Sequence, residues 1–285
     1  MSQQNTHTDM ANLPRRALGQ TGRVLPVLGF GLSGPHGQSV VPRKDTHALI
    51  ELALCLGVEV FDTAPFYGDG EAEARLGRAL EQVGESIPRF VTTKGGTFKQ
   101  NGKWTKDFSR SGLKSQLDAA KGRLRNIDAF FLHGFPLHGL SQDVIAWLTD
   151  AKAAGDFAHL GVAARGEDLD VALDTGLFDL VMAPVNSALT SQELNRLEAV
   201  RSAGLGVIGI ECIANAAKKI RFSIRPADLW YTARALIRQQ TSRSIYTPED
   251  SLLWALNSGL ADIVLVTTTR QAHLEANVKT ARRLC

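Results

Sequence analysis

The chain has 285 residues, of which 44% are hydrophobic and 21% are charged, with a formal net charge of +3. This composition is typical of a globular domain with a large core, and the length is common for an α/β barrel. A basic nucleic-acid surface is excluded, because the largest basic cluster has only four members, namely Lys218, Lys219, Arg221 and Arg225. No apolar run reaches the roughly 20 residues needed to cross a bilayer, so we expect no membrane partner.

Three cysteines, Cys55, Cys212 and Cys285, show no metal-binding or redox spacing. We therefore predict no metal site, and such sparse cysteine usage suits a reducing compartment. Cys55 lies in an apolar helical pattern, which predicts a place in the core. The polar N-terminus lacks the apolar segment of a secretion signal. These features together predict a cytoplasmic protein.

The chain begins with a polar segment, 1–13, which we predict to be a mobile tail before a single domain over 14–285. A Gln-Thr-Gly turn between two short apolar stretches then predicts a β-hairpin. From there strands and helices alternate. We predict strands near 27–32, 58–64, 89–95, 129–134, 160–164, 180–186, 206–211 and 263–269. We predict helices near 45–57, 70–83, 112–124, 142–155, 169–176, 191–204, 227–240, 248–259 and after residue 270.

Three helix starts carry capping signals, which are Asp45, Ser191, and Thr247 followed by Pro248. The polar segment 98–108 is expected to be an irregular loop. Many predicted strands are continuous apolar runs, as expected when both faces of a sheet are covered. An open doubly wound sheet would carry a GxGxxG turn after its first strand, and GFGLSGPHG lacks that spacing. The pattern predicts an α/β fold of the (β/α)8 TIM-barrel type, with an N-terminal β-hairpin and an extra helix between strands seven and eight.

Four polar residues, Asp62, Tyr67, Lys94 and His133, stand at or just beyond the ends of successive predicted strands. Taken singly, they read as a loop cap, a rim aromatic, a solvated lysine and a core histidine. In a barrel of parallel strands, however, the carboxyl ends of the strands converge on one mouth. The pattern therefore predicts that an acid, a phenol, an amine and an imidazole meet there.

This set of groups fits the reduction of a carbonyl, which requires a proton for the developing alkoxide. A nearby ammonium such as Lys94 favours the phenolate form of a tyrosine such as Tyr67 and makes it a better proton carrier. Asp62 would keep the lysine charged and oriented, and His133 would polarise the substrate oxygen. Because no side chain supplies a hydride, a nicotinamide cofactor is required.

The segments RALGQTGRVLPVLGFG, FDTAPFYGDGEAEARLGRAL, VTTKGG and DAFFLHG resemble the aldo-keto reductase superfamily, bacterial type, over about residues 15–284. The resemblance implies an NADP-dependent oxidoreductase that reduces an aldehyde or ketone reversibly. It also implies that Asp62, Tyr67, Lys94 and His133 form the catalytic tetrad, with Tyr67 as the general acid and base.

The C-terminal segment IVLVTTTRQAHLEANV is similar to the part of the family that holds the adenosine 2′-phosphate, which favours NADP(H) over NAD(H). By this resemblance Thr268 and Arg270 would contact the phosphate and Asn277 the adenine. A helix N-terminus, hydroxyls and a guanidinium also make a good anion site. The resemblance implies cofactor contacts at Leu32, Asp62, Ala164, Met182, Ile210, Glu211, Cys212, Thr267, Thr268, Arg270 and Asn277.

The expected nicotinamide site departs from the common family pattern. Ala163 and Ala164 replace a Ser-Asn pair, and Met182 replaces a glutamine, although Asn186 is present. Ile210 stands where a stacking tyrosine is frequent. Each lost hydrogen bond costs about 0.5–1.5 kcal/mol unless water or backbone replaces it.

Two other functions stay open at this point. The altered nicotinamide site suggests an NADPH-binding regulatory barrel with little turnover. A non-redox lyase would use Lys94 as a Schiff-base amine. For the reductase, Phe66, Phe98, Trp104 and Trp230 either line a pocket for a small-molecule carbonyl substrate or pack the loops onto the barrel. The sequence defines neither the natural substrate nor the oligomeric state.

Overall fold

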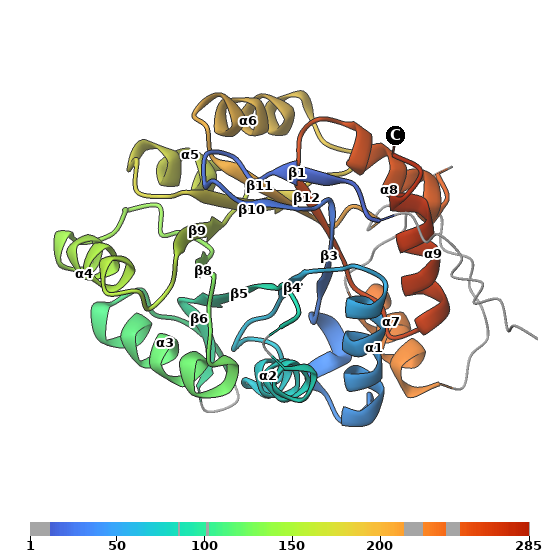
Figure 1. Ribbon diagram of the computed structural model, residues 1–285. Helices are drawn as coiled ribbons and strands as arrows, with labels where there is room; N and C mark the ends of the chain where they lie inside the picture. Colours follow the sequence, from blue (N-terminus) through green and yellow to red (C-terminus); the bar gives the residue numbers. More distant parts are fainter. Residues whose placement is uncertain (1–11, 85, 101–102, 214–224, 238–245, 285) are drawn as a thin grey trace, which may run out of the picture.

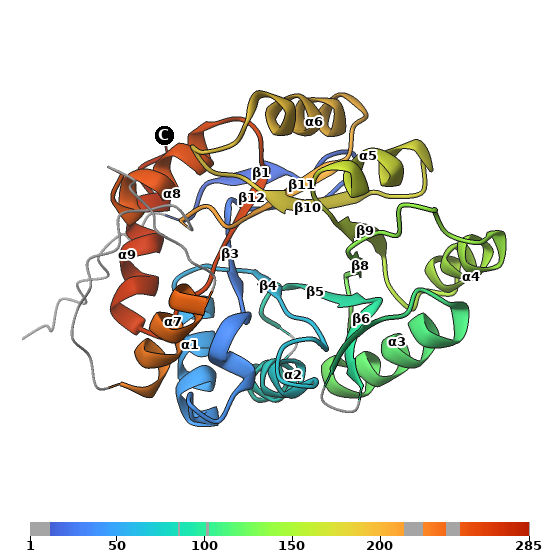
Figure 2. The ribbon, with the colours of Figure 1, turned by 180° about the vertical axis from the view of Figure 1, so that it is seen from behind.

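The computed structural model describes residues 12–84, 86–100, 103–213, 225–237 and 246–284, and every structural statement below refers to them. Their backbone forms a closed barrel of eight parallel strands inside a ring of helices (Figures 1 and 2). The first barrel strand, β3 (Leu28–Gly31), pairs with the last, β12 (Ile263–Val266). This closure confirms the predicted (β/α)8 barrel and rules out the open sheet.

Around the barrel each strand pairs with the next barrel strand in the chain, so all carboxyl ends lie on one side. Between β3 and β12 lie β4 (Val60–Asp62), β5 (Phe90–Gly95), β8 (Ala129–His133), β9 (His159–Ala163), β10 (Leu180–Pro184) and β11 (Gly206–Ile210). The helices of the ring are α1 (Arg43–Cys55), α2 (Glu71–Val83), α3 (Arg110–Leu124), α4 (Gln142–Ala153), α5 (Glu167–Asp174), α6 (Ser191–Ser202), α8 (Pro248–Asn257) and α9 (Gln271–Ala281).

The extra helix predicted between strands seven and eight is present as α7 (Pro226–Ile237). It packs on a short 3-10 turn, η1 (Gly34–Gly37), which follows β3 at the barrel mouth. The predicted positions 238–240 lie outside the described residues. Because η1 follows β3, the extra helix lies beside the first loop of the mouth.

Two of the three predicted helix caps differ in the structure. Pro42 is the N-cap of α1, so Asp45 lies within the first turn instead of capping it. At α6 the cap is Thr190, one residue before the predicted Ser191, because the Thr190 hydroxyl accepts from the Glu193 amide and the Glu193 carboxylate accepts from the Thr190 amide at 2.7 Å. Thr247 caps α8 as predicted, accepting from the Asp250 amide at 3.1 Å.

The N-terminal hairpin closes the end of the barrel opposite the mouth. Its strands β1 (Arg15–Ala17) and β2 (Val24–Pro26) pair antiparallel, as predicted. Leu18 and Leu25 are buried in a cluster with the first residues of several barrel strands, including Val60 and Phe90. Of the predicted tail, only residues 12 and 13 are described, and the Leu13 side chain is buried.

A second hairpin lies at the mouth, where an irregular loop was predicted over 98–108. The strands β6 (Thr97–Gln100) and β7 (Lys103–Lys106) pair antiparallel directly after β5. The loop prediction was wrong because these strands are short and mostly polar, so no apolar alternation marks them. A structured hairpin at this position can hold side chains in fixed places over the site.

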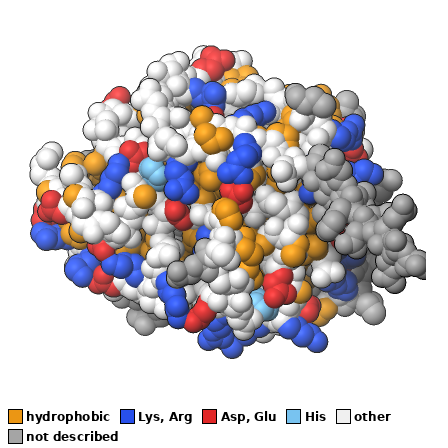
Figure 3. All heavy atoms as spheres, in the orientation of Figure 1, with side chains coloured by type: hydrophobic (Ala, Val, Ile, Leu, Met, Phe, Trp, Pro, Cys, Tyr) orange, Lys and Arg blue, Asp and Glu red, His pale blue; other side chains and the backbone are white. Residues whose placement is uncertain are grey.

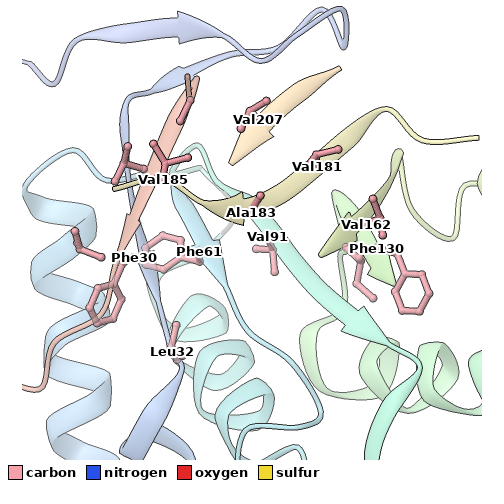
Figure 4. Packing of buried hydrophobic residues seen from close by; sticks show 14 of the residues in the cluster. Phe30, Leu32, Phe61, Val91, Phe130, Val162, Val181, Ala183, Val185 and Val207 are labelled. Carbon is pink, nitrogen blue, oxygen red and sulfur yellow. The ribbon is translucent and has the colours of Figure 1, made fainter. Parts of the chain in front are cut away.

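Between the strands and the helices lies a large apolar cluster, part of which is drawn in Figure 4, including Phe30, Phe61 and Val91. Cys55 was predicted to belong to the core but is exposed, because it is the last residue of α1 and lies off the buried face formed by Leu49, Ile50 and Ala53. Cys212 is buried.

The surface carries charges of both signs. Figure 3 shows Lys and Arg side chains interspersed with Asp and Glu over the face in view. Within the described part of the chain, no helix has both the length and the apolar character needed to cross a membrane.

Candidate active site

A buried ion pair occupies the centre of the mouth. Lys94, in β5, is 1% exposed, and its Nζ donates to Asp62 Oδ1, at the end of β4, over 2.5 Å. The same Nζ donates to the Thr63 carbonyl at 2.9 Å, and the Thr92 hydroxyl donates to Asp62 Oδ1 at 2.7 Å. Both charges are therefore held by hydrogen bonds in a place that water does not reach.

The alternation of a β-strand explains this placement. Thr92 and Lys94 are two residues apart in β5 and share its inner face, while Thr93 points the other way, toward α2. There the Thr93 hydroxyl donates to the buried Glu73 carboxylate at 2.6 Å, and Arg123 from α3 pairs with the same carboxylate at 2.7 Å. The outer face of β5 is thus tied to two helices, which fixes the strand that carries Lys94.

Tyr67 follows β4 in the loop that leads into α2. Its ring centroid lies 5.2 Å from Lys94 Nζ, and the tyrosine and the lysine also form a hydrogen bond. Two glycines allow the loop to sit against η1. A Cβ on Gly37 would lie 2.2 Å from the Tyr67 carbonyl oxygen, and one on Gly68, at φ +71°, would lie 2.0 Å from the Gly37 oxygen. Backbone contact between the two loops therefore sets the position of the phenol.

His133 ends β8 on the other side of Tyr67, with ring centroids 6.3 Å apart. Its Nδ1 is buried without a hydrogen-bond partner. Burial lowers the pKa of this imidazole to about 3, and the neighbouring cations Lys94, Lys106 and Arg165 act in the same direction. The ring is therefore neutral at physiological pH and presents a single N–H as a donor.

Lys94 has the opposite charge state. Burial alone would lower its pKa, but the charges and hydrogen bonds of Asp62 and Tyr67 outweigh burial and raise it. The side chain is therefore an ammonium at neutral pH. A Schiff-base amine must lose its proton to attack a carbonyl, so this environment argues against the lyase alternative.

A second group of predicted residues lies at the carboxyl end of β12. Thr268 and Thr269 are buried, and Arg270 is the N-cap of α9, with its amide donating to the Thr268 hydroxyl at 3.1 Å. The first turn of α9 has no acidic residue. The hydroxyls of Thr267 and Ser33 lie 3.2 Å apart. Leu32, the predicted cofactor residue that precedes Ser33, is fully buried. A helix N-terminus with hydroxyls and a guanidinium is suited to an anion.

This group is joined to the first loop by a buried histidine. The ring of His36, in η1, is within hydrogen-bonding distance of the Thr268 carbonyl through Nε2 at 3.0 Å and of the Thr46 hydroxyl through Nδ1 at 3.5 Å. Burial lowers its pKa to about 4, so the ring is neutral. Asn277, on α9, is half-buried.

The Arg270 guanidinium already has a protein partner, because it forms an ion pair with Asp228 of α7. Arg225, just before α7, donates to the Thr269 carbonyl at 3.3 Å. The extra helix therefore reaches across to the β12–α9 turn. No local sequence pattern predicts this pairing, since Asp228 lies far from Arg270 in the chain.

The remaining predicted cofactor residues lie around the ends of β9, β10 and β11. Met182 is 2% exposed and packs in the inner barrel cluster, and the Ala164 amide donates to the Met182 carbonyl at 3.2 Å. Ile210 packs against the same cluster. Glu211 follows it with φ +56°, a left-handed backbone that is uncommon outside glycine. The side chains of Ala164, Met182 and Ile210 here are apolar, whereas the Glu211 carboxylate pairs with Arg165 at 3.1 Å.

Cys212 does not add a reactive group. Its side chain is buried, and burial raises the pKa of the thiol to about 12. The Asn186 amide donates to the Glu211 carbonyl at 3.4 Å, so it supports the backbone at this turn. Among the described residues no group of three or more His, Cys, Asp or Glu side chains is arranged to hold a metal ion.

The fold agrees with solved structures over nearly the whole chain. An aldo-keto reductase from Bacillus halodurans in its holo form matches with a TM-score of 0.77 and 20% identity, covering 94% of this chain and 91% of that one. A glycerol dehydrogenase from Gluconobacter oxydans matches with a TM-score of 0.70 and 17% identity, covering 94% and 89%. At these identities the matches support the fold alone.

Sequence comparison defines the family. The model of the aldo/keto reductase family matches residues 27–284. L-galactose dehydrogenase from Arabidopsis thaliana is 30% identical over 72% of this chain and 67% of its own length. D-threo-aldose 1-dehydrogenase from a Pseudomonas species is 23% identical over 93% and 92%. The chain belongs to the aldo/keto reductase family, a family of oxidoreductases.

The neutral state of His133 gives a testable pH dependence of stability. The unfolded chain binds a proton on this imidazole below about pH 6.5, but the folded protein does not until about pH 3. Stability is therefore lost as the pH falls through this window. Lowering the pH from 7 to 5 should reduce the free energy of unfolding of the wild type by about 1–2 kcal/mol more than that of His133→Gln. Urea unfolding of both proteins at the two pH values measures this difference. Equal losses of stability in the two proteins would contradict a neutral His133 in the folded state.

Proposed function

We propose that this protein reduces an aldehyde or ketone to the alcohol, reversibly, with NADP(H) as the cofactor and Tyr67 as the general acid and base. The observation that carries the proposal is the buried Asp62–Lys94 ion pair beside the Tyr67 ring. A structural lysine does not need to be buried at a barrel mouth next to a phenol. Lysine is almost never fully buried unless it is paired.

In this proposal the substrate oxygen lies between Tyr67 and His133, whose ring centroids are 6.3 Å apart with the ring planes nearly perpendicular. The neutral imidazole donates a hydrogen bond that polarises the carbonyl. The phenol delivers the proton as the alkoxide develops, and the Lys94 ammonium stabilises the phenolate that remains. Asp62 keeps the ammonium charged and in place. In the reverse direction the phenolate accepts the alcohol proton.

A bound nicotinamide cofactor would supply the hydride. The β12–α9 turn fits its 2′-phosphate, because the buried Thr268, the N-terminus of α9 and the Arg270 guanidinium form an anion-binding set, in which the phosphate would share Arg270 with Asp228. The nicotinamide end has fewer polar partners, since Ala164, Met182 and Ile210 offer only apolar side chains there. Affinity would therefore come more from the phosphate end than from the ring.

A regulatory barrel that binds NADP(H) with little turnover is the second candidate. The apolar surroundings of Ala164 and Met182 favour it, because they would leave the carboxamide without side-chain hydrogen bonds. The reductase predicts turnover that depends on Tyr67, whereas the regulatory barrel predicts cofactor binding with little turnover.

Replacing Tyr67 tests the proton transfer. We expect Tyr67→Phe to reduce the rate of aldehyde reduction by about 10²–10⁴-fold, since a positioned general acid contributes that much. Cofactor absorbance with a panel of aldehydes measures the rate, and fluorescence titration measures whether NADPH still binds. Tyr246→Phe, at an exposed tyrosine, is the matched control and should keep full activity. A wild type that binds NADPH tightly without turnover would instead support the regulatory barrel.

Replacing Arg270 tests the cofactor preference. Loss of a charge-assisted hydrogen bond to phosphate costs about 1.5–3 kcal/mol, so Arg270→Ala should weaken NADPH binding by about 10- to 100-fold. NADH, which lacks the 2′-phosphate, should bind nearly as well as before. Calorimetric titration with both cofactors measures this, with Arg283→Ala, at an arginine with an exposed side chain, as the control. An equal loss for the two cofactors would contradict the phosphate contact.

A further inference from the structure

The β6–β7 hairpin turns one face toward the catalytic histidine. In its register Thr97 pairs with Lys106 and Lys99 pairs with Trp104, and cross-strand partners share a face. The Thr97 hydroxyl donates to the His133 carbonyl at 2.7 Å. Trp104 stacks on Phe66 with ring centroids 3.6 Å apart, and Phe66 in turn contacts the His133 ring at 5.3 Å. Thr97, Lys99, Trp104 and Lys106 therefore lie on the side of the hairpin that faces the site.

Lys106, on the same face, also lies close to the backbone that carries the His133 imidazole. Its Nζ lies 3.7 Å from the point where a Cβ on Gly134 would stand, and Gly134 follows His133 directly. The side chain is exposed, so it remains available to a ligand that enters the mouth. The ammonium is also one of the cations that act electrostatically on His133.

Three other described cations near the mouth have carboxylate partners. Lys99 pairs with Asp69 at 3.5 Å, and Arg165, which follows β9, pairs with Glu211 at 3.1 Å. Lys94 pairs with Asp62. Within the described ranges Lys106 forms no ion pair or side-chain hydrogen bond, so no carboxylate of the described residues balances its charge.

We infer that Lys106 binds an anionic group of the substrate, so that the enzyme prefers carbonyl compounds bearing a carboxylate or phosphate near the reacting carbon. The Phe66–Trp104 stack lies beside the His133 ring and offers apolar surface that suits the carbon skeleton of such a substrate. This inference rests on the proposed carbonyl reduction, since it places the reacting oxygen at Tyr67 and His133.

Two aldehydes that differ only in charge test the inference. Para-formylbenzoate carries the anion, and para-formylbenzamide is its neutral counterpart of similar size. We expect the wild type to favour the benzoate in kcat/KM, and added salt to reduce that preference. Lys106→Met should lower kcat/KM for the benzoate by about 2- to 5-fold, the upper part of the range for an exposed charge pair, and leave kcat/KM for the benzamide nearly unchanged.

Two control variants separate a direct contact with the substrate anion from the general effect of losing one positive charge. Lys99→Met changes a lysine on the same hairpin face whose charge Asp69 already balances, and Lys114→Met changes an exposed lysine on α3. Both should keep the wild-type preference for the benzoate. Equal use of the two aldehydes by the wild type, or equal losses for both in Lys106→Met, would overturn the inference.

Calorimetric titration of the protein with each aldehyde distinguishes the inference from the proposed function. If the wild type binds the benzoate more tightly than the benzamide and Lys106→Met abolishes this difference, the anion contact is supported even when neither aldehyde is reduced. That outcome would count only against the proposed reductase activity. Reduction of both aldehydes without any charge preference in binding or rate would leave the reductase standing and refute the role of Lys106.

Discussion

The proposed chemistry of this site depends on one buried ion pair, between Asp62 and Lys94. Removing an ammonium and a carboxylate from water costs several kcal/mol for each ion, and their attraction repays this only with good geometry and further hydrogen bonds. Here those bonds come from the Thr92 hydroxyl and the Thr63 carbonyl. Removing one partner of such a pair typically costs 3–5 kcal/mol, about the range in which single substitutions become severe.

Much of the surrounding structure can be understood as support for that pair. The outer face of β5 is fixed to α2 and α3 through Glu73, whose buried carboxylate binds both Thr93 and Arg123. The loop that carries Tyr67 is held by backbone contact with η1 at Gly37 and Gly68. The same η1 turn reaches the β12–α9 turn through His36 and Thr268. The proposed proton-transfer groups and the proposed phosphate site are therefore parts of one connected framework.

The barrel and the convergence of the four polar residues were predictable from sequence, because continuous apolar strands and strand-end polar residues are regular signals. Other features were not. Ser191 and Thr190 are adjacent cap candidates, and only the reciprocal bond with Glu193 selects Thr190. The β6–β7 hairpin is too polar to show an apolar period. The pairing of Arg270 with Asp228 depends on how α7 packs, which no local pattern encodes.

In the proposed mechanism the buried Lys94 charge keeps Tyr67 ready to exchange a proton. The pH dependence of alcohol oxidation by wild type and Lys94→Met, in the presence of saturating cofactor, tests it most directly. We expect the oxidation rate to rise with pH as the phenol loses its proton, and the midpoint of that rise to move upward by about one pH unit or more in Lys94→Met. An unchanged midpoint in a folded Lys94→Met variant would contradict the claim.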